Sequence, residues 1–116
     1  MRPISARVKK LLDEEPDICC RYADGGCKGR ITREHALIYA GRQIDEAWAI
    51  PKLCAYHHAV DEFQDGGDLQ KEKNVWIALN RASDEELQKY SKVINYIRER
   101  ERLNGIYGVY HPPRKA

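Results

Sequence analysis

The sequence contains no long apolar segment and has very little phenylalanine or methionine. One phenylalanine (Phe63) and one methionine occur among its 116 residues, and 33% of the residues are charged. No apolar run approaches the roughly 20 residues of a membrane-spanning helix, so we expect no association with membranes. A chain of this length corresponds to a single domain, residues 1–116, with a small core. Such a core often needs an additional stabilising element, for example a structural metal ion.

The N-terminal segment also lacks the apolar stretch of a secretion signal. Charged residues occur throughout MRPISARVKKLLDEEP, where a signal peptide needs apolar ones. We therefore expect a cytoplasmic protein, and in that reducing compartment the four cysteines are more commonly metal ligands than disulfides. The formal net charge of +2 is too small to indicate nucleic-acid binding by itself.

Side chains that bind soft metal ions are concentrated in residues 19–63. This stretch contains all four cysteines and three of the four histidines. Cys54 and His57 have the C-x-x-H spacing of a zinc knuckle, in which a turn and the start of a helix each supply one ligand. Upstream, Cys27 pairs with Cys20 or with Cys19, and the spacing does not distinguish the two. We predict a structural Zn²⁺ held by Cys20 (or Cys19), Cys27, Cys54 and His57.

Local patterns predict a mixture of helices and short strands. Ser5 can cap a helix over residues 5–15, and Pro16 ends it. Residues 17–29 are expected to form a knuckle hairpin that turns at Asp24-Gly25-Gly26. The segments expected next are a strand at residues 31–38, a loop at 40–42, a strand at 44–53, a helix at 54–63, a break at 65–68 and a short helix at 69–82.

The C-terminal third is expected to be one long helix followed by a tail. Ser83-Asp84-Glu85-Glu86 is a capping box that begins a helix over residues 83–103, and Asn104-Gly105 ends it. Residues 104–116 are then an extended or mobile tail. The apolar stripe of the long helix fits packing on the core and pairing with a second copy equally well, so a homodimer or another protein partner stays open.

The order and spacing of these residues resemble those of the HNH endonucleases, which have the ββα-metal fold. The shared pattern is a Cys pair, the acidic–His pair Glu34-His35 on a first strand, a second strand, and Leu53-Cys54-x-x-His57-His58 opening a helix. The resemblance covers the middle third of the chain. It implies an α+β fold in which residues 17–63 form a small zinc-stapled HNH-like core with flanking N- and C-terminal helices. The compact size is similar to that of phage or prophage members.

The resemblance also implies roles for individual residues. Glu34 occupies the acidic position that binds a catalytic divalent metal, Mg²⁺ or Mn²⁺ and possibly Zn²⁺. His35 occupies the position of the general base, and the pKa of an imidazole suits that role. His58 occupies the position of the second metal ligand. Glu62, or its neighbour Asp61, is a candidate third ligand one helical turn beyond His58.

Side-chain directions leave two points open. Neighbouring residues at the start of a helix point about 100° apart, so His57 can face the zinc while His58 faces the active site, although His58 could also replace His57 on the zinc. On a regular strand, Glu34 and His35 point to opposite faces, which conflicts with both reaching one phosphate. Ala49 stands where the family has an asparagine that braces the loop holding the base, which puts the orientation of His35 in doubt.

The predicted function is that of a metal-dependent HNH-like endonuclease, a hydrolase that cuts DNA phosphodiester bonds. Arg30, Arg33 and Arg42 flank the site and are candidates for contacts with DNA phosphates. One alternative is a catalytically inactive zinc-stapled module that binds DNA or protein. Another is a zinc-knuckle adaptor that binds protein only.

Overall fold

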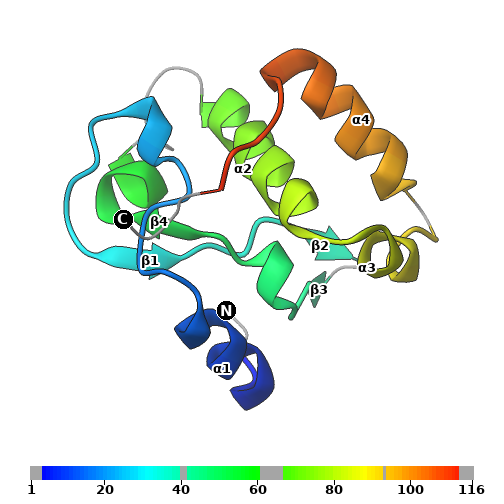
Figure 1. Cartoon of the computed structure of the whole chain (residues 1–116), viewed down its shortest axis with the longest axis horizontal. Helices are drawn as coiled ribbons and strands as arrows, with labels where there is room; N and C mark the ends of the chain where they lie inside the picture. The colour runs from blue at the N-terminus through cyan, green and yellow to red at the C-terminus, as the bar shows by residue number, and fades with distance from the viewer. Residues whose placement is uncertain (1–3, 40–41, 61–66, 93, 113–116) are drawn as a thin grey trace.

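The computed structural model describes residues 4–39, 42–60, 67–92 and 94–112. Short strands lie near the centre of this part of the chain, with helices around them (Figure 1). No helix within it is long and apolar enough to cross a bilayer. In chain order the elements are α1 (Ala6–Glu14), η1 (Tyr22–Asp24), β1 (Ile31–Arg33), β2 (Ile38–Tyr39), β3 (Arg42–Gln43), η2 (Ala47–Ala49), β4 (Lys52–Cys54), η3 (Tyr56–Val60), α2 (Gly67–Arg81), α3 (Asp84–Lys89) and α4 (Tyr96–Tyr107).

The strands form two separate antiparallel pairs. β1 pairs with β4, with Ile31 opposite Cys54, and β2 pairs with β3. We expected two longer strands, at residues 31–38 and 44–53, and those lengths were wrong. The returning segment is interrupted by the η2 turn and then by Pro51, which has no N–H to donate to a strand ladder.

Residues 17–29, which precede β1, bond to the backbone of β4 and do not form a hairpin of their own. All of residues 17–29 are described and none of them is in a strand, so the expected hairpin was wrong. The N–H of Cys20 donates to the carbonyl of Lys52 (2.7 Å), which places the segment alongside β4. The expected glycine turn is present, because Gly25 and Gly26 have φ values of 76° and 75°, which glycine adopts without a Cβ clash.

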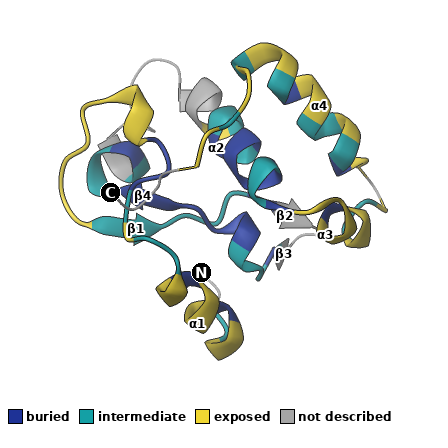
Figure 2. Cartoon of the chain, viewed as in Figure 1, coloured by how far each residue is buried: buried dark blue, intermediate teal, exposed yellow. Residues whose placement is uncertain are grey.

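The N-terminal helix α1 confirms the prediction for residues 5–15. The hydroxyl of Ser5 accepts a hydrogen bond from the N–H of Val8 (3.3 Å), and the helix ends before Pro16. Val8 and Leu12 are fully buried in a small cluster with Ile50, while the opposite face of α1 is exposed (Figure 2). This amphipathic helix therefore packs on the segment that leads into β4.

Helix α2 contributes the centre of the main core. It is the helix expected at residues 69–82, but it begins at Gly67, so the predicted break was wrong for Gly67 and Asp68. Its middle part is buried against η2 and α4 (Figure 2). Among residues 71–81, whose side chains are described, those buried are Asn74, Trp76, Ile77, Ala78 and Leu79.

The single helix expected at residues 83–103 is two helices, α3 and α4. The predicted capping box of Ser83 and Glu86 is present at the start of α3. The break comes at Ser91, whose hydroxyl donates to a carbonyl of α3 (2.6 Å) and accepts from the N–H of Tyr96 (3.2 Å). A side chain that bonds the backbone in this way competes with continuation of the helix.

Helix α4 extends beyond the end that we expected. The stop predicted at Asn104-Gly105 was wrong, because the helix continues to Tyr107 and ends at Gly108, where φ is 88°. The residues that follow return to the core, and the ring of Tyr110 lies edge-on to Trp76 (centroids 5.3 Å apart). The end of the expected tail lies outside the described residues.

The helix expected at residues 54–63 is represented by η3, a short π-helical turn. Such turns contain wider hydrogen-bonded loops than an α-helix and are frequent at functional sites. Glu62 and Asp61, the candidate third ligands, lie outside the described residues.

Candidate metal centre and adjacent cleft

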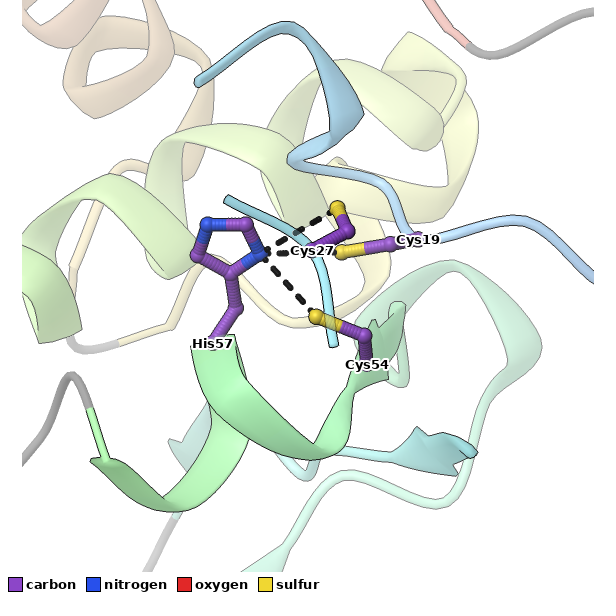
Figure 3. Close-up of side chains that lie close together, drawn as sticks. All are labelled: Cys19, Cys27, Cys54 and His57. Carbon is purple, nitrogen blue, oxygen red and sulfur yellow. Dashed lines mark hydrogen bonds between the residues drawn. The ribbon is translucent and has the colours of Figure 1, made fainter. Parts of the chain in front are cut away.

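Four side chains converge at the end of β4. Cys54 is the last residue of β4, His57 lies in η3, and Cys19 and Cys27 come from the segment before β1. The three sulfur atoms point toward the imidazole of His57 (Figure 3). Their distances from Nδ1 of His57 are 3.4 Å for Cys19, 3.6 Å for Cys27 and 3.2 Å for Cys54. All four donor atoms lie within 4.8 Å of one another, so this Cys₃His cluster can hold a metal ion.

The dimensions of the Cys₃His cluster fit a tetrahedral zinc ion. Bonds of about 2.3 Å to sulfur and about 2.0–2.1 Å to nitrogen, at tetrahedral angles, separate sulfur from nitrogen by roughly 3.5 Å. The three observed distances span 3.2–3.6 Å. Three of the four ligands are buried, which is typical of a closed structural site without an open coordination position. The cluster is therefore consistent with structural zinc.

Close backbone packing brings Cys27 to the cluster. The N–H of Tyr56 donates to the carbonyl of Lys28 (3.1 Å), which fixes the Cys27 loop against the start of η3. Gly29 has a φ of 82°, and a Cβ atom at this position would lie 2.8 Å from the Cβ of Ala55. Glycine is thus required at position 29 for both its backbone conformation and the close approach of two chain segments.

The protonation of the thiols depends on their surroundings. Burial raises the pKa of Cys19 to about 12 and also raises the pKa of Cys27. Burial acts in the same direction on Cys54, but backbone hydrogen bonds from His57 and Lys28 outweigh it and lower the pKa of that thiol. Metal binding must therefore release protons from Cys19 and Cys27, and Cys54 is the thiol best prepared to bind as a thiolate.

The structure distinguishes the alternatives that the spacing left open. Cys19 belongs to the Cys₃His cluster and Cys20 does not; the sulfur of Cys20 instead lies 4.0 Å from a guanidinium nitrogen of Arg81. Similarly, His57 and not His58 faces the three sulfur atoms.

His58 faces a second group of side chains, which comprises Thr32 of β1 and Glu34, the residue directly after β1. Its Nε2 atom lies 3.1 Å from Oε2 of Glu34, and its Nδ1 atom lies 2.5 Å from the hydroxyl oxygen of Thr32. The side chains of His58 and Glu34 are 29% and 17% exposed, but the Oε2 atom of Glu34 that faces His58 is itself buried. The consecutive histidines thus face two different groups of side chains, as the helical geometry predicted.

Hydrogen bonding assigns the proton on His58. The hydroxyl of Thr32 has a single proton and donates it to the carbonyl of Leu53 (2.8 Å). Its contact with His58 therefore requires that Nδ1 of the imidazole be the donor. In the neutral ring Nε2 is then an acceptor facing the carboxylate of Glu34, and two acceptors 3.1 Å apart require a proton or a cation.

Glu34 and His35 line the same cleft, although a regular strand would point them to opposite faces. β1 ends at Arg33, so the alternation of a strand does not extend to these two residues. Burial lowers the pKa of His35, while the charge of Asp45 opposes the shift. The cleft has a volume of about 340 Å³, and its lining residues are Glu34, His35, Ala36, Lys71, Glu72, Asn74 and Val75.

Backbone bonds hold the segment that carries His35. The N–H of Glu34 donates to the carbonyl of Pro51 (3.0 Å), and the N–H of Ala36 donates to the carbonyl of Ala49 (3.1 Å). Ala49 is fully buried and contributes only its backbone to this bracing. His35 is therefore fixed on both sides without an asparagine side chain at position 49.

The structure describes the side chains of two of the three arginines predicted to contact DNA, Arg30 and Arg33. Arg30 and Arg33 line a second cleft of about 300 Å³ together with Lys52, close to Thr32. Arg33 is already paired with Asp13 (2.6 Å). The side chain of Arg42 lies outside the described residues, so its predicted role is not addressed.

Sequence reasoning missed two residues of the site, Thr32 and Asn74. Thr32 had a signal, because it lies two positions before Glu34 and residues at this spacing share one face of a strand. Asn74 lies on α2, far along the chain from Glu34 and His35, and only the fold brings it to their cleft.

No protein-family model matches the chain, and no curated protein or solved structure is significantly similar to it.

Proposed function

We propose that this protein is a metal-dependent endonuclease that hydrolyses DNA phosphodiester bonds, with an HNH-like core stabilised by structural zinc. The observation that carries the proposal is the placement of Glu34, His35 and His58. Glu34 and His58 form a carboxylate–imidazole pair at a separation of 3.1 Å, and Glu34 and His35 line one cleft. A nearby pair of metal-binding donors and a candidate base are the groups that metal-assisted hydrolysis requires.

The Glu34–His58 pair suits a divalent cation. Two adjacent donors on an octahedral ion with bonds of about 2.1 Å lie roughly 3 Å apart, close to the 3.1 Å between Oε2 and Nε2. Thr32 orients the imidazole so that the Nε2 lone pair faces Glu34. A Mg²⁺ or Mn²⁺ ion bound there would act as a Lewis acid and stabilise charge on the leaving 3′ oxygen.

His35 acts as the general base in this mechanism. Its imidazole accepts a proton from water as the water oxygen forms a bond to phosphorus, and the bond from phosphorus to the 3′ oxygen breaks. The leaving oxygen takes a proton from solvent, which gives a 5′ phosphate and a 3′ hydroxyl. Burial lowers the pKa of His35, so the ring is neutral and able to accept a proton at neutral pH.

Basic residues beside the site support a nucleic-acid substrate. Lys71 is exposed on the cleft that contains His35, and Arg30 is exposed on the neighbouring cleft near Thr32. Each of these cations lines a cleft that also contains Glu34 or its neighbour Thr32, which supports contacts with DNA phosphates there.

A second candidate function is DNA or protein binding without catalysis. Ala49 favours it, since the HNH enzymes that the sequence resembles have an asparagine at this position. The orientation of His58 toward Glu34 and the backbone bracing of His35 favour catalysis. A binding module needs neither feature.

Plasmid cleavage tests the proposal. Purified protein is incubated with supercoiled plasmid in Mg²⁺, Mn²⁺ or EDTA, alongside His35→Ala and His58→Ala. The control is His111→Ala, which changes an exposed histidine outside the cleft. We expect metal-dependent nicking that falls by roughly 10²-fold or more in His35→Ala and is unchanged in His111→Ala. A wild-type protein that binds zinc but is inert with every metal and DNA form would favour the binding module.

A further inference from the structure

Two cations, Arg33 of β1 and Lys52 of β4, lie directly opposite each other in the strand pair. Residues at opposed positions share one face of a sheet, and like charges there destabilise the pairing. Both residues line a cleft of about 300 Å³ that also contains Arg30, and three positive charges in one cleft favour an anionic partner. We call this space, lined by Asp17, Arg30, Ile31, Thr32, Arg33 and Lys52, the basic cleft.

Residues 13–17, here called the acidic segment, supply carboxylates to the basic cleft. The segment reads DEEPD and follows the buried part of α1. A carboxylate oxygen of Asp13 lies 2.6 Å from the guanidinium of Arg33, and one of Asp17 lies 3.6 Å from the ammonium of Lys52. Each of the two opposed cations is thus paired with a carboxylate of the acidic segment.

These two ion pairs are exposed and weak. The side chains of Asp13 and Asp17 are 66% and 80% exposed, and pairs made by exposed carboxylates contribute little to stability. A separation of 3.6 Å is also too long for a hydrogen bond, so only charge connects Asp17 with Lys52. Another anion can therefore take the place of either carboxylate.

The cations differ in what they offer an incoming anion. Arg30 is exposed and Arg33 is half-buried, so both guanidinium groups can reach a phosphate, with which arginine forms paired hydrogen bonds. Lys52 is buried and donates to the carbonyl of Glu15 (3.2 Å), so it contributes positive charge without a contact surface. Thr32 lines the basic cleft and also contacts His58, which makes the cleft a neighbour of the proposed metal site.

We propose that the acidic segment competes with DNA for the basic cleft, so that a DNA phosphate displaces Asp13 from Arg33 and takes over the role of both carboxylates. This inference rests on the proposed nuclease function and adds a regulatory contact to it. In the absence of DNA the acidic segment neutralises the cleft, which weakens binding of other anions. DNA, with many phosphates along its backbone, competes more effectively than a single small anion.

Helix α1 should stay in place when its carboxylates are exchanged. Val8 and Leu12 are fully buried against Ile50, and Arg7 pairs with Glu46 (2.9 Å) at the other end of the helix. Neutralising the acidic segment therefore tests competition without detaching the helix that carries it. Thermal unfolding checks this, and we expect an unchanged Tm for Asp13→Asn/Asp17→Asn.

Fluorescence anisotropy with a short labelled DNA duplex measures the competition. The protein is loaded with zinc, and no Mg²⁺ or Mn²⁺ is added, so that the duplex stays intact. We expect Asp13→Asn/Asp17→Asn to lower the Kd for DNA by roughly tenfold at low salt. The matched control is Asp84→Asn/Glu99→Gln, which changes the net charge equally and removes one acidic partner from each of two arginines on α4. Helix α4 lines neither cleft, so this control should change Kd by less than about threefold.

Arg33→Gln provides a second test, because its effect should depend on the acidic segment. In the wild-type background Arg33 is already paired with Asp13, and we expect DNA binding to weaken by no more than about threefold. In the Asp13→Asn/Asp17→Asn background the same substitution should weaken binding by roughly tenfold. A general effect of net charge would give equal factors in the two backgrounds.

The outcomes separate this inference from the nuclease function. Equal strengthening by the two double variants, or equal effects of Arg33→Gln in both backgrounds, would overturn the competition, while plasmid cleavage still decides the nuclease function independently. DNA binding by Asp13→Asn/Asp17→Asn alone would support the competition. If none of the zinc-loaded proteins binds DNA at low salt, the competition is wrong, and inert wild-type protein in the plasmid assay would then overturn the nuclease function as well.

Discussion

Oε2 of Glu34 and Nε2 of His58 lie 3.1 Å apart, on two segments that the β1–β4 pair brings together. Because Thr32 requires the proton of His58 to be on Nδ1, the facing Nε2 and carboxylate both present lone pairs in the neutral state of the ring. The hydroxyl of Thr32, which bonds to the backbone of β4, thus influences the charge at the position proposed to bind a cation. This influence leads directly to the first prediction.

Thr32→Val should weaken divalent-metal binding without changing the two proposed ligands. Valine has nearly the shape of threonine but cannot hydrogen-bond to His58, so the imidazole loses its fixed orientation. We expect a 10- to 100-fold weaker Kd for Mn²⁺, the range typical of lost partners of metal-binding histidines. Titration of Mn²⁺ followed by electron paramagnetic resonance measures it, with Glu34→Ala as the reference for full loss. Equal Mn²⁺ affinity in wild type and Thr32→Val would contradict the assigned role of the hydroxyl.

Cys19→Ser and Cys20→Ser should differ in zinc content. The two cysteines are neighbours and both are buried, but only Cys19 belongs to the Cys₃His cluster. We expect Cys20→Ser to keep one zinc ion per chain and Cys19→Ser to lose it or hold it far more weakly. Elemental analysis of purified proteins after dialysis against a mild chelator measures the stoichiometry. Zinc retained by Cys19→Ser and lost by Cys20→Ser would reverse the assignment.

Gly29→Ala should be more destabilising than Gly25→Ala. Both glycines have positive φ values, 82° and 76°, so alanine is strained at either position. Only at Gly29 would the new Cβ meet another atom closely, 2.8 Å from the Cβ of Ala55, whereas nothing lies within 4 Å at Gly25. We expect losses in the free energy of unfolding of about 1 kcal/mol for Gly25→Ala and at least about 2 kcal/mol for Gly29→Ala.

Urea unfolding of the zinc-loaded proteins measures both losses. Adding Ala55→Gly to Gly29→Ala removes the close contact and should recover the difference between the two variants. If the double variant recovers nothing, the steric explanation is wrong.

Asp24→Asn should destabilise the protein by an amount that does not change between pH 6 and 8. Asp24 accepts a hydrogen bond from Arg21 within the same turn (2.9 Å) and one from Lys73 (2.9 Å), which connects η1 with α2. Burial alone would raise the pKa of Asp24, but these two cations outweigh it and hold the pKa below its ordinary value. The contribution of a carboxylate with a lowered pKa is complete above its unfolded value of about 3.9 and is lost as the pH falls through the folded value.

We therefore expect a constant loss of about 1 kcal/mol in this pH window, where the carboxylate stays ionised. Urea unfolding at pH 6, 7 and 8 measures it. Asp13→Asn is the control, because the Asp13 side chain is 66% exposed and its pair with Arg33 should contribute little. A loss that shrinks between pH 8 and pH 6 would mean that Asp24 titrates there and that the assigned pKa direction is wrong.

Short-range signals in the sequence predicted much of the local structure. Ser5 and Pro16 bound α1, Ser83 and Glu86 begin α3, and the glycine pair turns the chain at residues 25–26. Each of these signals acts through one or two backbone groups within a few residues. For the same reason, the C-x-x-H spacing was enough to predict that Cys54 and His57 are both metal ligands. Both residues lie in the Cys₃His cluster.

Other features depend on partners far along the chain. Cys19 and Cys20 are equivalent by spacing, and the choice follows from the hydrogen bond that holds the backbone of Cys20 against Lys52. The long C-terminal helix was expected from its apolar stripe, and the stripe could not reveal that Ser91 would bond to the backbone on both sides. Such competition between a side chain and the helix is resolved by tertiary packing.

The amino-acid sequence alone was sufficient to identify the candidate metal ligands Cys54 and His57, the caps of α1 and α3, and the expectation that His57 and His58 point in different directions. Periodicity and spacing decide these features, because they depend on neighbouring residues. Only the three-dimensional arrangement brought Glu34 to His58, turned Glu34 and His35 into one cleft and placed Asn74 of α2 beside them. These relationships depend on where β1 ends and on how a distant helix packs, and no local pattern encodes either of them.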